Sequence, residues 1–148
     1  MKNRITLALL GLTISSGALA FGEVGRWSSG WGQGVSEYTV VDAKQNQLYI
    51  ACGDEPARMQ LTVNGRQYGY GAAQGFSLVI DGRDMGESYE TESRVGSDIF
   101  KATWAALRKG KTLVAKLPNG QKILLPLTGA AKVLPSSQSK TYPCRTEW

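Results

Sequence analysis

Short runs of β-branched and aromatic residues, separated by turn-forming segments, occupy most of the chain and constrain its fold more than any other feature. Runs of about four to eight such residues predict strands. Asn64-Gly65, Asp81-Gly82 and Pro118-Asn119-Gly120 stand between consecutive runs, and these residue types readily adopt the positive φ of hairpin turns. The expected strands cover residues 37–41, 47–52, 58–63, 67–70, 76–80, 88–91, 111–117 and 121–127. The pattern predicts a mostly β fold, an antiparallel β-sandwich or partly open barrel of about seven or eight strands.

One segment has the period of a helix instead. Between residues 94 and 110, side chains recur at spacings of three and four, namely Phe100, Thr103, Trp104 and Leu107. Ser97 is the expected N-cap, and Gly110 stands where a glycine often ends a helix. We predict one α-helix here, with Trp104 in the core, and a short helical turn over residues 129–134.

The start of the chain has the pattern of an export signal. Lys2 and Arg4 precede an apolar run, and Ala18 and Ala20 supply the small residues of a signal peptidase site. We expect residues 1–20 to be a signal peptide, cleaved near Ala20, and the protein to be periplasmic or secreted. The apolar run is shorter than a membrane-spanning helix, so stable membrane insertion is not expected.

The remaining 128 of 148 residues fit one domain. Residues 21–36 are rich in glycine and tryptophan without a regular period, which predicts an irregular N-terminal arm. Residues 37–148 then form a single β-rich domain. Cys52 ends an expected strand, and Cys144 lies in an extended tail. Export favours a Cys52–Cys144 disulfide that straps the tail to the fold, although an intermolecular bridge or two free thiols remain alternatives.

Composition excludes several classes of function. The chain contains no histidine, so a Ser-His-Asp triad, a Cys-His pair and a histidine-zinc site cannot be built from it. It has 17 basic and 12 acidic residues, and loss of Lys2 and Arg4 leaves a net charge of +3. The basic residues form no long run, and export removes the protein from nucleic acid. We therefore expect no nucleic-acid partner, no metal and no cofactor.

Five residues are candidate binding residues. Trp27 and Trp31 lie in the glycine-rich segment, where exposed aromatic rings would anchor a protein or glycan partner; alternatively, they lie across an open sheet. Tyr68 and Tyr70 would line one face of a sheet, although aromatic residues are also common strand formers. Arg94 precedes the predicted helix, where backbone N–H groups could hold an anion; a simple capping loop is the alternative.

An acidic segment supports a second hypothesis, because paired carboxylates are the acid and base of glycoside hydrolases. The segment contains Asp81, Asp84, Glu87, Glu90 and Glu92. A solvated turn and strand face explains the same residues. Their spacing lacks the alternating ligands of a calcium loop.

The order of elements resembles that of small bacterial periplasmic β domains, namely the invasion-associated locus B family and type VI secretion-associated periplasmic proteins. The resemblance covers residues 47–144. It includes the 48–52 strand, the Asp81-Gly82 turn, the helix before Gly110, the 125–130 segment with Leu134, and Cys144. The extra cysteines of many invasion-associated proteins are missing. The resemblance implies a non-enzymatic envelope protein that acts by contact. We expect an exported binding or accessory protein that recognises an envelope or host protein or a glycan; the alternative is a secreted carboxylate-dependent glycan hydrolase.

Overall fold

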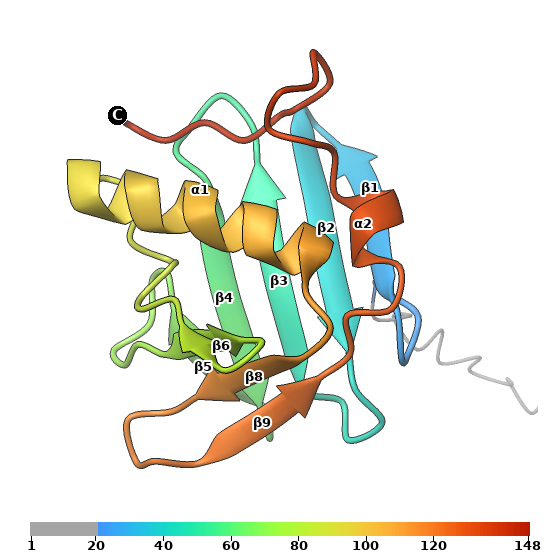
Figure 1. Ribbon diagram of the computed structural model, residues 1–148, viewed down its shortest axis with the longest axis vertical. Helices are drawn as coiled ribbons and strands as arrows, with labels where there is room; N and C mark the ends of the chain where they lie inside the picture. Colours follow the sequence, from blue (N-terminus) through green and yellow to red (C-terminus); the bar gives the residue numbers. More distant parts are fainter. Residues whose placement is uncertain (1–20) are drawn as a thin grey trace, which may run out of the picture.

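The computed structural model describes residues 21–148 and contains two antiparallel sheets and two helices. The predicted signal peptide, residues 1–20, lies outside the described residues. The elements are β1 (Trp27–Gly32), β2 (Val35–Val41), β3 (Gln47–Cys52), β4 (Arg58–Val63), β5 (Arg66–Gly69), β6 (Ser77–Ile80), β7 (Arg83–Asp84), α1 (Arg94–Lys109), β8 (Leu113–Lys116), β9 (Lys122–Leu125) and α2 (Ala130–Val133) (Figure 1). The predicted fold class, a mostly β antiparallel sandwich with one long helix and a short C-terminal helix, is confirmed.

Strands β1 to β5 form the first sheet, here called the large sheet, in the order in which they occur in the chain. Each strand is antiparallel to its neighbour, and Ile50 of β3 lies between Tyr38 of β2 and Met59 of β4. In β3 and β4, the side chains at every second position are buried. Because successive side chains of a strand point to opposite faces, one face of the large sheet lies on the core and the other faces solvent.

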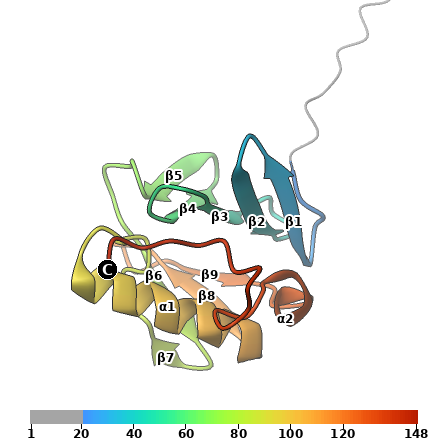
Figure 2. The same cartoon turned by 90° about the horizontal axis from the view of Figure 1, so that it is seen from above.

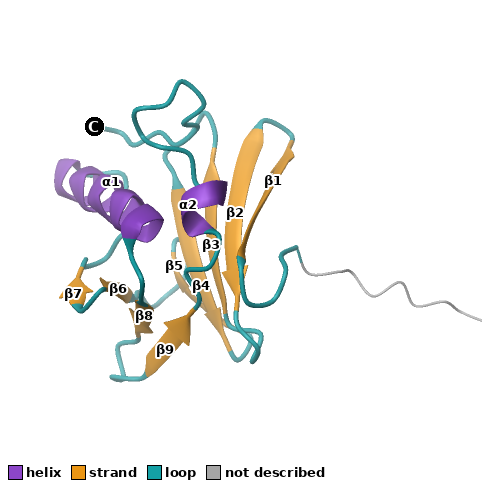
Figure 3. Ribbon diagram, turned by 45° about the vertical axis from the view of Figure 1, so that its right-hand side comes forward, coloured by secondary structure: helices purple, strands orange, loops and turns teal. Residues whose placement is uncertain are grey.

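The second layer consists of the small sheet and the helices. The small sheet has the order β7-β6-β8-β9, and α1 lies beside it across the inner face of the large sheet (Figure 2). The buried residues of α1 include Phe100, Trp104 and Leu107, so the predicted helical face and the core position of Trp104 are confirmed. Helix α2 lies between α1 and the large sheet (Figure 3) and contacts α1 and β1.

The start of α1 differs from the prediction. Ser93, rather than Ser97, is the N-cap, because its extended backbone lets its hydroxyl accept a hydrogen bond from the Gly96 N–H. Ser97 is buried in the first turn, where its hydroxyl donates to Thr91 O at 3.1 Å. The helix therefore begins four residues earlier than a Ser97 cap would allow.

The prediction of an irregular N-terminal arm is wrong. Residues 27–32 form β1, which pairs with β2 along its whole length from Trp27↔Val40 to Gly32↔Val35. Gln33 and Gly34 join the two strands, both with positive φ (51° and 80°). Glycine and serine have low strand propensity, but cross-strand pairing and burial of one tryptophan outweigh that local preference.

The predicted strand at residues 88–91 is also absent, because this segment is a turn and loop. Its hydroxyl side chains are buried and join the two layers. Ser88 shares a 2.7 Å hydrogen bond with Thr103 of α1, and Thr91 donates to Ala57 O at 2.6 Å. Ser88 and Thr91 therefore link α1 to the large sheet, whereas Tyr89 packs on the Phe76 ring at a centroid distance of 5.4 Å.

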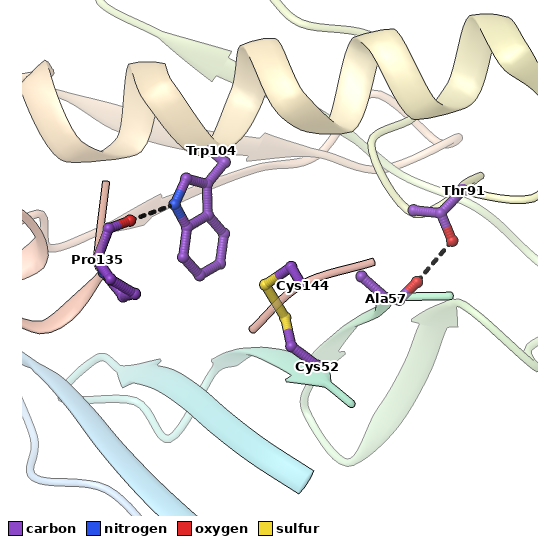
Figure 4. Close-up of a disulfide and its surroundings, with 6 residues drawn as sticks. All are labelled: Cys52, Ala57, Thr91, Trp104, Pro135 and Cys144. Atoms are coloured by element: carbon purple, nitrogen blue, oxygen red, sulfur yellow. Dashed lines mark hydrogen bonds between the residues drawn. A yellow bond between two sulfur atoms is a disulfide. The ribbon is translucent and has the colours of Figure 1, made fainter. Parts of the chain in front are cut away.

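The C-terminal tail is strapped to the large sheet as predicted. Cys52 at the end of β3 and Cys144 form a disulfide with a Cα–Cα distance of 4.5 Å (Figure 4). The Ala57 N–H also donates to Arg145 O at 2.8 Å. The predicted turns at Asn64-Gly65, Asp81-Gly82 and 118–120 and the helical turn near residue 130 are present as well.

Candidate binding groove on the large sheet

The solvent face of the large sheet carries a shallow groove of about 370 Å³. We call it the sheet groove. Its walls come from the end of β1 and the turn that follows, the start of β2, the second half of β3, the start of β4 and the residue after β5. The lining residues are Gly32, Gln33, Val35, Glu37, Tyr49, Ala51, Arg58, Gln60 and Tyr70. Strand alternation explains this set, because residues 35, 37, 49, 51, 58 and 60 all point away from the core.

Tyr49 and Glu37 form the polar centre of the groove. The Tyr49 hydroxyl donates to a carboxylate oxygen of Glu37 at 2.5 Å. Burial, followed by the hydrogen bond and the charge of Glu37, raises the pKa of Tyr49 well above its usual value of 10.0. The hydroxyl is therefore a fixed donor to Glu37 at neutral pH, and the second carboxylate oxygen remains an acceptor for a ligand.

Arg58 and Tyr70 form the opposite wall. The guanidinium carbon of Arg58 lies 5.1 Å from the centre of the Tyr70 ring, within the range of a cation–π contact. Arg58 also pairs with Glu55 at 2.9 Å, but both side chains are exposed, and such a pair adds little stability. These two contacts orient the Arg58 head group, and its remaining donors are open to solvent.

Gly69 explains why Tyr70 reaches the solvent face. Its φ of +91° reverses the strand alternation, so that Tyr68 points to the core and Tyr70 turns outward over Arg58. A Cβ on Gly69 would lie 2.6 Å from the Phe76 ring and 2.8 Å from Met59 O. The Gln60 amide then fixes the position by donating to Tyr70 O at 2.8 Å.

Two of the five predicted binding residues are buried, which corrects the prediction for them. Trp27 is only 2% exposed, and its indole N–H donates to Pro126 O at 3.1 Å. Tyr68 is 6% exposed and belongs to the core. Both occupy strand positions that point to the inner face, where apolar rings are most stable.

The structure separates the other three predicted residues. Tyr70 lines the sheet groove. Trp31 is 75% exposed. It lies four residues after Trp27 on β1, so its side chain points to the inner face of the sheet, opposite the sheet groove. Arg94 is exposed at the first turn of α1. The Ser93 hydroxyl accepts from one N–H of that turn, as in the capping-loop alternative.

The acidic segment has structural contacts. Asp81 accepts hydrogen bonds from the N–H groups of Lys111 and Thr112 at 2.8 and 2.9 Å, and these contacts lower its pKa. The Gly86 N–H and then Lys116 lower the pKa of Asp84. A general acid of a glycosidase needs the opposite shift. The described part of the chain therefore assigns these two aspartates to turn and strand stabilisation.

Within residues 21–148, no group of three or more Cys, Asp or Glu side chains is arranged to hold a metal ion. None of the described helices is both long and apolar enough to cross a membrane. The polar and aromatic side chains that line the groove are instead two tyrosines, one cation, one carboxylate and two amides. This set can form hydrogen bonds and stack on a flat ligand.

Sequence reasoning missed Glu37, Tyr49, Arg58 and Gln60. The alternation within 47–52 and 58–63 marks residues 49, 51, 58 and 60 as one face, so the signal was present in the strand pattern. What the pattern lacks is the register, which places Tyr49 directly opposite Gln60 and Ala51 opposite Arg58. The strand pattern does not show that Tyr70 faces solvent, because this orientation depends on the positive φ of Gly69.

Comparison with known proteins gives one match. The model of the YfjT family matches residues 25–134, which include every strand and both helices. No curated protein and no solved structure matches the chain.

Proposed function

The chain belongs to the YfjT family, and from its geometry we propose that it is an exported, non-enzymatic binding protein of the bacterial envelope. It recognises a protein or glycan partner through the sheet groove. The observation that carries this proposal is the groove itself, in which Tyr49, Glu37, Arg58 and Tyr70 are held in place by contacts with one another.

Three features support this proposal. The groove is open and shallow, and its rings and polar groups suit recognition of a surface rather than enclosure of a substrate. The disulfide fits an oxidising compartment outside the cytoplasm. The resemblance of residues 47–144 to periplasmic β domains points to the same location and to a role through contacts.

The observations support the glycan hydrolase alternative less well than they support the binding protein. Asp81 and Asp84 have lowered pKa values and fixed structural partners. Hydrolysis would need one carboxyl with a raised pKa facing a second across a cleft.

Binding can be tested with a glycan probe and a protein probe, used separately. The glycan probe is a set of immobilised peptidoglycan and lipopolysaccharide oligosaccharides, and the protein probe is a detergent-free envelope protein extract. The variants are Arg58→Ala and Tyr70→Ala, both at side chains outside the core. Trp148→Ala is a matched control, because Trp148 is 66% exposed and lies at the end of the tail. We expect either groove variant to weaken binding at least about tenfold, as for a residue at the centre of an interface, and the control to bind like the wild type.

Binding that survives both groove variants would place recognition elsewhere and refute the role of the groove. Release of soluble sugar fragments from peptidoglycan, lost on Glu87→Gln or Glu92→Gln substitution, would instead establish the hydrolase. Retention on the oligosaccharides alone identifies a glycan ligand, and retention of extract proteins alone identifies a protein ligand.

A further inference from the structure

The two sheets have four outer strands, and three of them carry features that discourage pairing with another strand. Charged side chains, proline and very short strands are the usual protections. β7 consists only of Arg83–Asp84, β5 begins with Arg66, and β9 begins with Lys122 and is followed at once by Pro126. β1, Trp27–Gly32, has neither charge nor proline.

The hairpin turn determines which backbone groups of β1 face outward. Gln33 and Gly34 form a two-residue turn with positive φ at both positions, closed by the pair Gly32↔Val35. In such hairpins the closing pair exchanges both of its hydrogen bonds, and every second residue does the same. Residues 28, 30 and 32 therefore bond to β2, whereas residues 27, 29 and 31 point their backbone groups away from it.

A hydrogen bond to another segment supports this assignment. The backbone N–H of Trp27 donates to Thr128 O at 2.9 Å, so it does point away from β2. The next two outward positions are Ser29 and Trp31, whose backbone N–H and C=O groups have no hydrogen-bond partner among residues 21–148. The open edge is thus bounded by the Trp27–Thr128 contact at one end and by the hairpin turn at the other.

Exposed aromatic rings flank this open edge on both faces of the sheet. Trp31, on the inner-face side, is the most exposed of the large apolar side chains among the described residues. On the solvent side, the ring of Phe21 lies over Gly30, where a Cβ would approach it to 2.7 Å. Phe21 is itself 38% exposed. The edge therefore offers both backbone hydrogen bonds and apolar contact.

We propose that β1 is a dimer interface, in which β1 of a second copy of this chain adds antiparallel to the open edge with the two-fold axis at Gly30. The open window, residues 28–32, is symmetric about Gly30. In this register Ser29 pairs with the partner's Trp31, and Trp31 with the partner's Ser29. The four unpaired groups of each copy then satisfy those of the other.

The side chains favour a second copy as the occupant. Each Trp31 ring lies beside the short side chain of the partner's Ser29, on the same face. Gly30 faces the partner's Gly30 in a non-hydrogen-bonded pair, where two strands approach most closely. Phe21 meets the partner's Phe21 on the solvent face. β1 has no charge that would repel its own copy, and the large sheet continues through the interface with five strands from each subunit.

One added strand pair buries less surface than a permanent dimer requires, so the dimer is expected to be weak and dependent on concentration. The test is sedimentation velocity of the protein recovered after expression of the full chain, from about 10 μM to about 1 mM. The wild type is expected to shift from monomer to dimer over this range. Trp148→Ala is the control and is expected to dimerise equally.

Two variants address the edge directly. Ser29→Pro removes an outward N–H and leaves the β1–β2 bonds in place, and Trp31→Lys places a charge on the edge without touching the core. Each is expected to weaken dimerisation at least about tenfold. Circular dichroism and thermal unfolding show whether each variant is folded. If the proline variant is unfolded, the dimerisation of Trp31→Lys alone tests whether β1 is the interface. A wild type that stays monomeric, or a dimer that survives Trp31→Lys, overturns the proposal.

Cross-linking tests the register. A cysteine at the two-fold axis faces its own copy, so Gly30→Cys, combined with Phe21→Ala to remove the ring above it, is expected to form an intermolecular disulfide under mild oxidation. Ser29→Cys is the control, because in this register it lies diagonally from its own copy, beyond the reach of a disulfide. Faster linkage of Ser29→Cys refutes the register. A monomer that instead binds extended peptides at β1 assigns the edge to a different partner.

Discussion

The indole N–H of Trp104 donates a hydrogen bond to the carbonyl oxygen of Pro135 at 2.8 Å, which joins the middle of α1 to the start of the C-terminal tail (Figure 4). The same ring contacts Tyr38 and Tyr142 edge to face, at centroid distances of 5.2 and 5.4 Å. Trp104 therefore connects the helix, the large sheet and the tail, and the disulfide is one of several contacts that hold the tail.

The Cys52→Ser/Cys144→Ser double variant should fold but be less stable. The disulfide closes a loop with a sequence separation of 92, and the chain-entropy model assigns such a loop up to about 4.5 kcal/mol. Urea unfolding of the variant measures the loss. Since Trp104 and Ala57 still bond the tail, we expect partial hydrogen-exchange protection of the Ala57 N–H to remain. A variant as stable as the wild type would contradict a structural role for the bridge.

Trp27→Ala should destabilise the fold by about 3 to 5 kcal/mol, the cost of removing a large buried aromatic side chain. Trp27 is 2% exposed and bonded through its indole to Pro126. Trp31→Ala is the matched control on the same strand. Its side chain is 75% exposed, and we expect a change within about 0.5 kcal/mol. Equal effects of the two substitutions on chemical unfolding would contradict the burial of Trp27.

Tyr142→Phe should leave the free energy of unfolding unchanged or raise it by up to about 1 kcal/mol. The Tyr142 hydroxyl is buried and has no hydrogen-bond partner in the described residues, whereas its ring contact with Trp104 would persist. A loss of more than about 1 kcal/mol would show that the hydroxyl has a partner, such as a bound water.

The same tyrosine should make stability fall at alkaline pH. Burial, followed by the charge of Tyr38, raises the pKa of Tyr142 from 10.0 to about 12. Above pH 10 the unfolded chain loses this proton and the folded chain keeps it, so the free energy of unfolding decreases as the pH rises toward 12. Tyr142→Phe should flatten that decrease. Urea unfolding at several pH values tests this, and identical slopes for the two proteins would contradict it.

Asp81→Asn should reduce the loss of stability in acid. Hydrogen bonds from the Lys111 and Thr112 N–H groups hold the folded pKa of Asp81 below 3.8. The ionised carboxylate therefore stabilises the fold above pH 3.8, and this contribution is lost as the pH falls through the lowered folded pKa. Asparagine tolerates the positive φ of this position, so the turn is kept. Acid unfolding that follows the wild type at every pH would argue against this contribution.

The strand pattern predicted most of the large sheet, because its alternation reflects one buried and one solvated face. Asn-Gly and Asp-Gly located two turns for a similarly local reason, since these residues accept positive φ. β1 was missed because its glycines and serines have no strand preference of their own. Residues 88–91 were assigned to a strand because burial in a loop between layers selects the same residue types as burial in a sheet.

The sequence by itself determined the class of fold and the helical face with Trp104, because both follow from local periodicity. It favoured the Cys52–Cys144 pairing through the cysteine count and the export pattern, and the structure then placed the two cysteines together. Only the tertiary structure decided which aromatic residues are free to bind. Trp27 and Trp31 lie four residues apart on one strand and occupy the same phase, yet one is buried and the other exposed. The difference arises because residues 126–128 contact Trp27, at the start of β1, through hydrogen bonds to Pro126 O and Thr128 O. Contacts between segments so far apart leave no periodic signal in the chain.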